Sequence, residues 1–311
     1  MNFKSHDLRH VIIHEEARKA IFRLKEHLFA RNYSEKTIST YANEMQFLFA
    51  FYPTLTPDEL QEDLIVDYIN FIIRNHGVGR SKCRSVAHAC CYFYRHILKL
   101  PYAVPSALYP KRHSVIPNII SRDHVVKIIN GITNLKYKLM ISLFYGTGLR
   151  TRELQHVKIQ DLDLVNFRLL VREAKGGNQR MAILPKSILP LLKMYLAKVS
   201  PEIYLFEGMV KGKPLRSRTI QWIVKTCVKQ SRLNIPYISA RTFRHCFATH
   251  LFEEGNNILA VKELMGHKRI ESTMIYLHFT QQARDAVVSP LDKLPLLPLG
   301  GTQISLFPHH F

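Results

Sequence analysis

The sequence lacks the features of membrane proteins and of exported, disulfide-bonded proteins. No apolar run approaches the about 18 residues that a bilayer-spanning helix needs, and the opening MNFKSHDLRHVII has only three apolar residues in a row. The five cysteines form no C-x-x-C pair, and an odd, scattered set fits reduced thiols in a core. We therefore expect a cytoplasmic protein with no membrane partner.

Motifs for bound metals and nucleotides are missing as well. The 16 histidines form no H-E-x-x-H motif and no His/Cys cluster with ligand spacing. No Walker motif occurs either. We therefore predict that the protein uses no metal and no cofactor.

Acidic residues are absent from two long stretches that are rich in cations. The chain has 44 Lys and Arg against 24 Asp and Glu, and nine basic residues lie in each of the stretches Tyr68 to Arg122 and Gly208 to Phe252. An ordinary solvated face mixes both signs, so these stretches indicate surfaces that contact phosphates. The predicted DNA-binding residues are Arg80, Lys82, Arg84, Arg95, Lys111, Arg112, Lys211, Lys213, Arg216 and Arg218.

The first third of the chain predicts a helical domain over residues 12–100. Apolar residues recur at helical spacing in four segments, the second of which opens at a capping residue, Ser34, and the third at Pro57. Residues 101–120 contain four prolines and no periodic pattern, which is typical of a linker.

Residues 121–283 predict a second domain, mostly helical with one small antiparallel sheet. The glycines of YGTGLR end a helix and place Arg150 on a turn before a short helix. The stretch FRLLVREAKGGNQRMAILP predicts a hairpin with Lys175 at its tip. The fold class is thus mainly α, with a four-helix N-terminal domain and an α+β C-terminal domain.

Two later helices carry further polar residues. Arg241 and Arg244 are three residues apart and share one face of the helix RTFRHCFATHLFEEG. The helix NILAVKELMG ends at a glycine and presents His267, and Tyr276 follows nine residues later in an apolar run. By itself, a tyrosine on such a helix is ordinarily a half-buried packing residue.

Five fragments together resemble one family. TGLRTREL, EAKGGNQR, SARTFRHCFATHL, LMGH and the IY beyond it stand in the order and spacing of the tyrosine recombinase (phage integrase) family. The resemblance covers the catalytic domain over about residues 121–280, and the four-helix segment is similar to the family's core-binding (SAM-like) domain. Any single fragment is weak evidence, whereas five in the right order favour a functional role for the tyrosine.

The resemblance implies a role for each matched residue. Arg150 and Arg244 correspond to the family's two catalytic arginines, whose planar forks can hold phosphate oxygens. Lys175 corresponds to the lysine that protonates the departing 5′ oxygen, and His267 to a residue that hydrogen-bonds a non-bridging oxygen. Tyr276 corresponds to the nucleophile, which stores the broken bond as a 3′-phosphotyrosyl link and so needs neither ATP nor metal.

Two positions leave questions open. Glu153 lies on the same helix face as Arg150 and either orients its guanidinium or is simply an acid at a helix N-terminus. Arg241 stands where the family usually has histidine, and it can clamp phosphate but is a poor general base. Deprotonation of Tyr276 is then left to solvent, to His267, or to a tyrosine pKa lowered by the surrounding cations.

The resemblance implies a site-specific recombinase that acts on double-stranded DNA at inverted-repeat sites, as a tetramer on two duplexes. Two alternatives remain: a DNA-binding regulator that has lost catalysis, and a type IB topoisomerase-like relaxase. The apolar tail over residues 284–311 has no net charge and four prolines. The resemblance implies that it docks on a neighbouring protomer, the alternative being a tail packed on its own domain.

Overall fold

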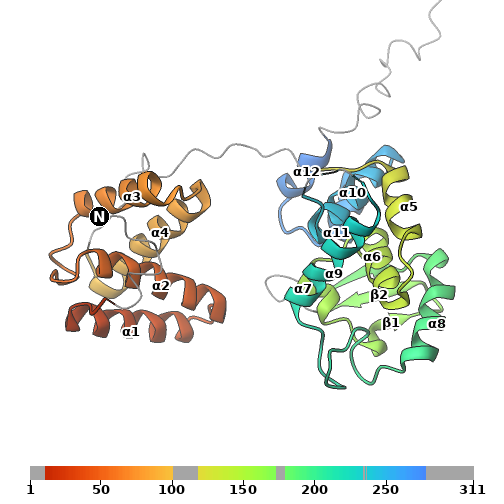
Figure 1. Ribbon diagram of the computed structural model, residues 1–311, viewed down its shortest axis with the longest axis horizontal. Helices are drawn as coiled ribbons and strands as arrows, with labels where there is room; N and C mark the ends of the chain where they lie inside the picture. The colour runs from red at the N-terminus through yellow and green to blue at the C-terminus, as the bar shows by residue number, and fades with distance from the viewer. Residues whose placement is uncertain (1–10, 101–117, 173–178, 234, 236, 278–311) are drawn as a thin grey trace, which may run out of the picture. The chain divides into compact units, whose positions relative to one another are not determined.

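The computed structural model divides the chain into two compact units, residues 1–114 and 115–311 (Figure 1). It describes residues 11–100, 118–172, 179–233, 235 and 237–277. The division falls inside the predicted linker, and each unit has a hydrophobic core of its own. The ends predicted for the two domains stay a prediction.

The described part of the N-terminal unit is helical. Its elements are α1 (Glu15–Ala30), α2 (Glu35–Phe51), α3 (Glu62–His76), α4 (Arg80–Phe93) and the π-helical turn η2 (Tyr94–Leu98). Ser34 caps α2 as predicted, because its hydroxyl accepts a hydrogen bond from the Thr37 N–H. Side chains at helical spacing, such as Leu24 and Leu28 of α1, are fully buried in the core.

The predicted start of α3 at Pro57 is wrong. The Glu59 carboxylate accepts hydrogen bonds from both the backbone N–H and the hydroxyl of Thr56, at 2.8 Å each. These bonds hold residues 56–59 in a local turn, so the helix begins only at Glu62.

The C-terminal unit combines helices with one small sheet. Its elements are α5 (Arg122–Asn130), α6 (Leu135–Thr147), α7 (Thr151–Gln155), η4 (Ile159–Asp161), β1 (Leu162–Asp163), β2 (Arg168–Val171), β3 (Arg180–Ile183), η5 (Lys186–Ile188), α8 (Leu189–Val199), α9 (Ser217–Gln230), α10 (Ala240–Glu253), α11 (Ile258–Met265) and α12 (Glu271–Leu277). The expected fold class, mainly α with a small antiparallel sheet, is confirmed.

The sheet contains the predicted hairpin. Its strand order is β1-β2-β3, both pairs are antiparallel, and Leu169 of β2 lies opposite Ala182 of β3. These two side chains are buried, which fixes the register by alternation. The hairpin tip, with Lys175, lies outside the described residues.

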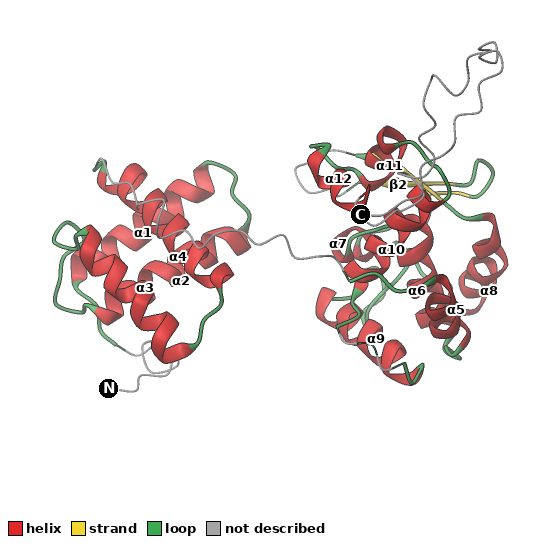
Figure 2. Ribbon diagram, turned by 90° about the horizontal axis from the view of Figure 1, so that it is seen from above, coloured by secondary structure: helices red, strands yellow, loops and turns green. Residues whose placement is uncertain are grey.

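Helix α10 lies at the middle of the C-terminal unit (Figure 2). It packs against α6, α11 and α12, and most of its side chains are buried, including Phe243 and Phe247. A buried helix can hold polar side chains in fixed positions, because packing locks their rotamers. In the described part of the chain, no helix is both long and apolar enough to cross a membrane.

Candidate active site

Two glycines end the helices that lead into the site. Gly148 closes α6 at φ 63° and Gly266 closes α11 at φ 61°, both in the left-handed region. A Cβ at Gly148 would lie 2.5 Å from a ring carbon of Phe247, and one at Gly266 would lie 2.5 Å from Cδ of Arg180. Glycine is therefore required at both turns by conformation and by space.

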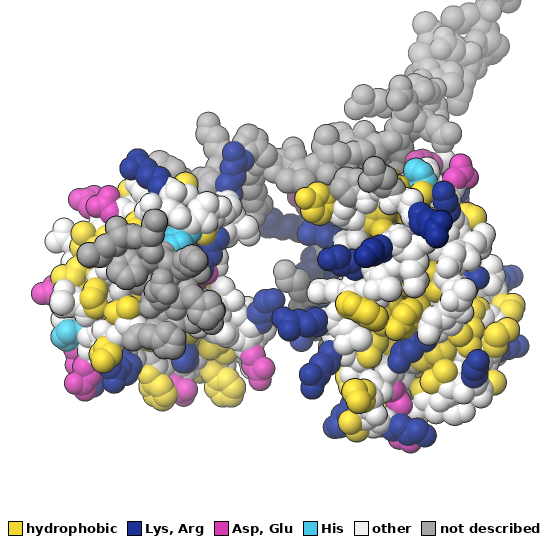
Figure 3. All heavy atoms as spheres, in the orientation of Figure 1, with side chains coloured by type: hydrophobic (Ala, Val, Ile, Leu, Met, Phe, Trp, Pro, Cys, Tyr) yellow, Lys and Arg dark blue, Asp and Glu magenta, His cyan; other side chains and the backbone are white. Residues whose placement is uncertain are grey.

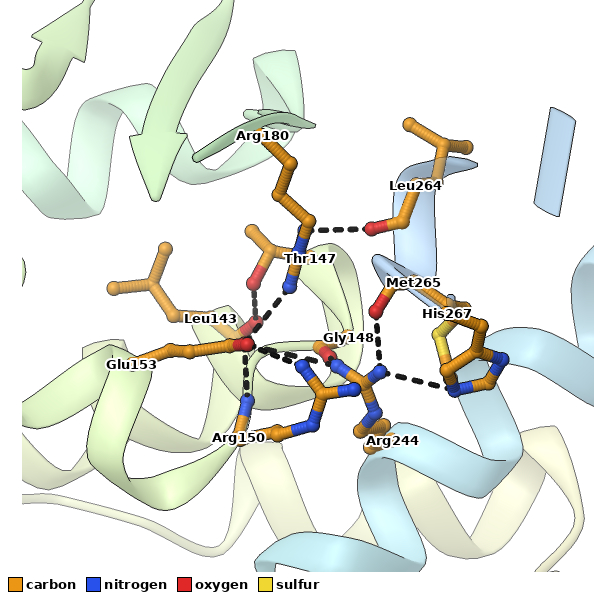
Figure 4. A network of polar contacts seen from close by, with 10 residues as sticks. All are labelled: Leu143, Thr147, Gly148, Arg150, Glu153, Arg180, Arg244, Leu264, Met265 and His267. Atoms are coloured by element: carbon orange, nitrogen blue, oxygen red, sulfur yellow. Dashed lines mark hydrogen bonds and ion pairs between the residues drawn. The ribbon is translucent and has the colours of Figure 1, made fainter. Parts of the chain in front are cut away.

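Arg244 of α10 ties these two helix ends together. Its guanidinium is buried and donates to the backbone carbonyls of Gly148 and Met265, which lie at the C-terminal ends of α6 and α11 (Figure 4). Such carbonyls lack intrahelical partners and attract cations. Burial and the neighbouring Arg150 lower the pKa of Arg244 to about 9, so it is still protonated at neutral pH.

Glu153 is the carboxylate at the centre of the arginines. Its two oxygens accept hydrogen bonds from the backbone N–H of Arg150 at 2.8 Å, from the Arg150 guanidinium at 2.5 Å and from the Arg180 guanidinium at 2.8 Å (Figure 4). Arg244 lies 3.7 Å away. Burial would raise the pKa of the Glu153 carboxyl, but the guanidinium of Arg180 and the Arg150 N–H outweigh it, and the pKa is lowered. Glu153 is thus a helix-capping acid and a partner of the arginines at once.

Arg180 was not among the predicted site residues. It is the first residue of β3, its side chain is only 7% exposed, and it also donates to the Leu264 carbonyl at 2.5 Å. It therefore joins the hairpin to α7 and to the end of α11. The sequence feature that could have pointed to a site role for Arg180 was its position on a short strand, five residues after Lys175.

His267 contacts Arg244 through one ring nitrogen and Thr273 through the other. Nε2 lies 3.2 Å from the Arg244 guanidinium, and Nδ1 lies 2.8 Å from the hydroxyl of Thr273. Since arginine can only donate, Nε2 accepts and Nδ1 carries the proton. Burial and the charge of Arg244 lower the pKa of His267 to about 4, so the ring is neutral at pH 7 in the free protein.

Tyr276 of α12 points its hydroxyl at a histidine that sequence reasoning missed. The ring is 2% exposed, and Oη lies 2.8 Å from Nδ1 of His245 on α10. Burial raises the pKa of Tyr276, although the charges of Arg244 and Arg241 oppose the shift. The sequence signal for His245 was only its position directly after Arg244.

The structure brings Arg150, Arg244, His267 and Tyr276 together, but the two arginines differ in their exposure to solvent. The Arg150 side chain is 32% exposed, whereas that of Arg244 is 6% exposed. Arg241 is exposed on the first turn of α10. Its charge nonetheless affects the pKa values of both His245 and Tyr276, which places it beside them. Lys175 lies outside the described residues.

Lys and Arg side chains lie on the surface of both units (Figure 3), and most of the predicted DNA-binding cations in the described residues are exposed. Those that are exposed are Arg80, Arg95, Lys211, Lys213, Arg216 and Arg218. Lys82 forms an ion pair with the buried Glu44, and Arg84 is half-buried. Lys111 and Arg112 lie outside the described residues. The basic segment 211–218 runs into α9, where the Ser217 hydroxyl donates to Gln155 at the end of α7, so this segment lies near the helix that begins beside Arg150.

The described residues contain no group of three or more His, Cys, Asp or Glu side chains that could hold a metal ion. The site that the structure does assemble is cationic, with one buried carboxylate, two neutral histidines and a protonated tyrosine. Guanidinium groups of this kind can stabilise the extra negative charge of a five-coordinate phosphorus.

Comparison with known proteins identifies two matching families. Residues 118–283, more than half of the chain, match the phage integrase family, and residues 21–103 match the N-terminal SAM-like domain of phage integrases. An integrase/recombinase of Escherichia coli is 26% identical and covers 90% of this chain and 95% of that protein. Tyrosine recombinase XerD of Listeria innocua is 29% identical and covers 80% of this chain and 89% of that protein.

Solved structures show the same fold. A crystal structure of XerH site-specific recombinase bound to palindromic difH substrate is 20% identical, has a TM-score of 0.68, and covers 90% of this chain and 91% of that one. A lambda integrase tetramer bound to a Holliday junction is 18% identical, has a TM-score of 0.68, and covers 83% of this chain and 76% of that one. The family match and the relatives named tyrosine recombinase favour the recombinase interpretation over the regulator and the relaxase. The chain belongs to the phage integrase family and is a tyrosine recombinase.

Proposed function

We propose that this recombinase cleaves and rejoins DNA strands through a 3′-phosphotyrosyl link formed by Tyr276. The observation that carries the proposal is the convergence of a buried tyrosine with Arg150, Arg244 and His267, from four separate segments of the chain. The rings of Tyr276 and His267 stack with their centroids 6.3 Å apart, and Nε2 of His267 lies 3.2 Å from the Arg244 guanidinium, so the tyrosine lies beside this cation. Attack by Oη on a phosphodiester held by those cations would need no outside energy source.

The proposed roles combine the exposure and charge of the arginines with the roles that the family resemblance implies for His267 and Lys175. Arg150, the more exposed arginine, holds the non-bridging oxygens. Arg244 fixes the helix ends, and its buried positive charge also stabilises the phosphate. His267 hydrogen-bonds the same phosphate once Nε2 is protonated, in place of the bond that Nε2 accepts from Arg244 in the free protein. Arg241 is a further clamp, and Glu153 orients the arginines. Lys175 protonates the departing 5′ oxygen.

The partner that fits this site is double-stranded DNA with inverted-repeat sites. The exposed cations of residues 80–95 and 211–218 would contact its phosphates, which predicts binding that weakens steeply with salt. XerH is described as bound to palindromic difH, and lambda integrase as a tetramer on a Holliday junction. By analogy, we place four protomers of this protein on two duplexes, in the cytoplasm and on the nucleoid.

The tail over residues 284–311 is proposed to dock on the adjacent protomer. Its support is its composition, with Leu306, Phe307 and Phe311 near the end and no net charge. Truncation after Leu294 is expected to leave binding to a single half-site nearly unchanged and to abolish cooperative loading of paired sites in a gel shift. Wild-type cooperativity in the truncated protein would show that the tail is not the link between protomers.

The central test is a nicked DNA substrate that traps the covalent intermediate. Tyr276→Phe keeps the packing of the ring but removes the nucleophile, so it is expected to bind DNA and to form no adduct. Tyr145→Phe, which removes a similarly placed hydroxyl elsewhere on the unit, is the matched control and is expected to form adduct normally. A normal adduct yield from Tyr276→Phe would overturn the proposed nucleophile.

Plasmid relaxation and two-site recombination, run side by side, test the wider activity. The proposed function predicts exchange between two sites that depends on Tyr276. Relaxation of a single duplex without exchange would instead identify a relaxase, and binding without either activity would identify a regulator.

A further inference from the structure

The phenolic proton of Tyr276 must leave when Oη attacks phosphorus, and its acceptor is the missing part of the proposed function. Arg241 occupies the position of the usual histidine, and a guanidinium donates hydrogen bonds but does not accept a proton. Burial raises the pKa of Tyr276, so the phenol does not ionise by itself. A base within hydrogen-bond reach of Oη is therefore required.

His245 is in that position. Its Nδ1 lies 2.8 Å from Oη of Tyr276, and the two ring centroids are 5.4 Å apart with the planes inclined at 48°. Among the described residues it is the one hydrogen-bond partner recorded for this hydroxyl. A buried phenol needs an acceptor for its proton, so Tyr276 donates and Nδ1 accepts, which leaves the ring proton of His245 on Nε2.

The other nearby groups cannot take the proton. Nε2 of His267 accepts from Arg244, and its Nδ1 carries the proton that faces Thr273. The Glu153 carboxylate is occupied by Arg150 and Arg180, and its pKa is lowered. Of the candidate bases that the structure describes in the site, His245 alone faces the nucleophile.

We infer that His245 is the general base that takes the phenolic proton of Tyr276 during cleavage and returns it during rejoining. The inference rests on the proposed function. In cleavage, the bond between Oη and phosphorus forms, the bond between phosphorus and O5′ breaks, and the phenolic proton moves to Nδ1 of His245. The departing O5′ takes its own proton from the general acid assigned to Lys175. In rejoining, the 5′-hydroxyl gives its proton back to the general acid assigned to Lys175 as O5′ attacks phosphorus. The bond between Oη and phosphorus breaks, and protonated His245 returns its proton to the leaving Oη.

The charges around His245 link its basicity to the substrate. Burial and the charges of Arg241 and Arg244 lower the pKa of His245 to about 4 in the free protein, which keeps Nδ1 unprotonated. The groups that face it are those two arginines on α10, Tyr276 on α12 and the neutral His267 after α11. A bound phosphate offsets the arginine charges and so raises the pKa of His245, which makes it a stronger base once DNA is present.

His245→Asn and His245→Ala, assayed by single-turnover cleavage of the nicked substrate, test the inference. Asparagine keeps an acceptor oxygen near Oη but cannot take a proton, so it separates a base from a residue that only positions the tyrosine. Both variants are expected to bind DNA normally and to cleave about 10²-fold more slowly, the usual size of a general-base contribution. Added imidazole is expected to restore cleavage to His245→Ala.

The pH profile gives a second readout. The wild-type cleavage rate is expected to fall as the pH drops through the pKa of His245 in the DNA complex. Both variants are expected to lack this inflection, and their cleavage rates should increase steadily with hydroxide concentration. His250→Ala, which removes an equivalent imidazole from the same helix, is the control with wild-type rate and profile.

A wild-type cleavage rate in His245→Asn would overturn the inference and show that His245 only positions Tyr276. If His245→Ala does not fold, the asparagine variant decides alone. Either result leaves the adduct test of Tyr276→Phe untouched, so failure of the base and failure of the nucleophile are distinguishable.

Discussion

Helix α10 carries the histidines of two histidine–tyrosine pairs whose hydrogen bonds have nearly the same length. His245 Nδ1 lies 2.8 Å from Tyr276 Oη, and His250 Nδ1 lies 2.9 Å from Tyr145 Oη. Burial lowers the pKa of both histidines and raises that of both tyrosines. The hydrogen bond itself therefore does not distinguish a reactive pair from a structural one.

The surrounding charges do distinguish them. The first pair faces Arg241 and Arg244, with Arg150 nearby, so an anion is attracted to it. Beside the second pair, Arg122 is neutralised by Glu254 at 2.7 Å and Glu253 at 3.5 Å. That pair also lines a cavity of about 660 Å³ whose other walls are mainly apolar. Excess positive charge, rather than the pair, marks the place where phosphate chemistry can occur.

The largest expected effect comes from removing the carboxylate that balances the arginines. Glu153→Gln leaves Arg180 and Arg244 buried without a counterion, and we expect the free energy of unfolding to fall by about 3 kcal/mol or more. Glu253→Gln, beside the second pair, removes a partly exposed ion pair and is expected to cost about 1 kcal/mol or less. Urea unfolding of the two variants measures the difference. Equal losses would show that Glu153 does not hold the arginines together.

The next effect concerns catalysis. Arg150→Ala is expected to slow single-turnover cleavage by about 10²-fold or more and to weaken DNA binding far less, because the guanidinium acts mainly on the transition state. Arg122→Ala, the corresponding change beside the second pair, is expected to cleave at nearly the wild-type rate. Arg244→Ala should also slow cleavage, but it releases two helix ends as well, so Arg150 gives the cleaner comparison. Matching losses of binding and cleavage in Arg150→Ala would make it an ordinary phosphate contact.

Periodicity and turn residues were sufficient to predict much of the fold. Local patterns, each spanning a few residues, predict the helices of the N-terminal unit, the hairpin, and the helix ends at Gly148 and Gly266. The start of α3 was missed because the side chain of Glu59 bonds back to Thr56, and helix-start signals do not include that competition. The strand β1 was missed because two residues carry no alternation.

The site residues that belong to sequence motifs were predictable, whereas those identified only by their three-dimensional contacts were not. Arg150, Arg244, His267 and Tyr276 were named from spacing and meet in space. Arg180 and His245 were missed, because their partners Glu153 and Tyr276 are 27 and 31 residues away. A basic or aromatic residue next to a motif has no signature until the fold shows what it faces. Three-dimensional proximity also removed two of the three explanations for tyrosine deprotonation, since His267 is engaged elsewhere and the pKa of Tyr276 is raised.

A smaller effect is expected at Arg241. Arg241→His removes a positive charge beside His245, which raises the pKa of His245. It also adds an imidazole that can itself accept the phenolic proton. Cleavage at neutral pH is expected to be retained or raised by a few fold in the nicked-substrate assay. Arg241→Lys keeps the charge and is the matched control, with little change expected. Complete inactivity of Arg241→His would show that this arginine is built into a different arrangement.

The last effect is on stability as a function of pH. The pKa values of His245 and His267 are about 4 in the folded protein, against about 6.5 in an unfolded chain. Between these values the unfolded chain binds more protons, so the free energy of unfolding declines as the pH falls from about 6.5 to about 4. Replacing both residues by asparagine removes two of the titrating groups, and the decline should become shallower in thermal melts recorded across this range. His250→Asn, at the second pair, removes one group whose pKa is also lowered and should flatten the curve less. Identical pH dependence in the wild type and the double variant would show that the two histidines are not held neutral by burial and the arginine charges.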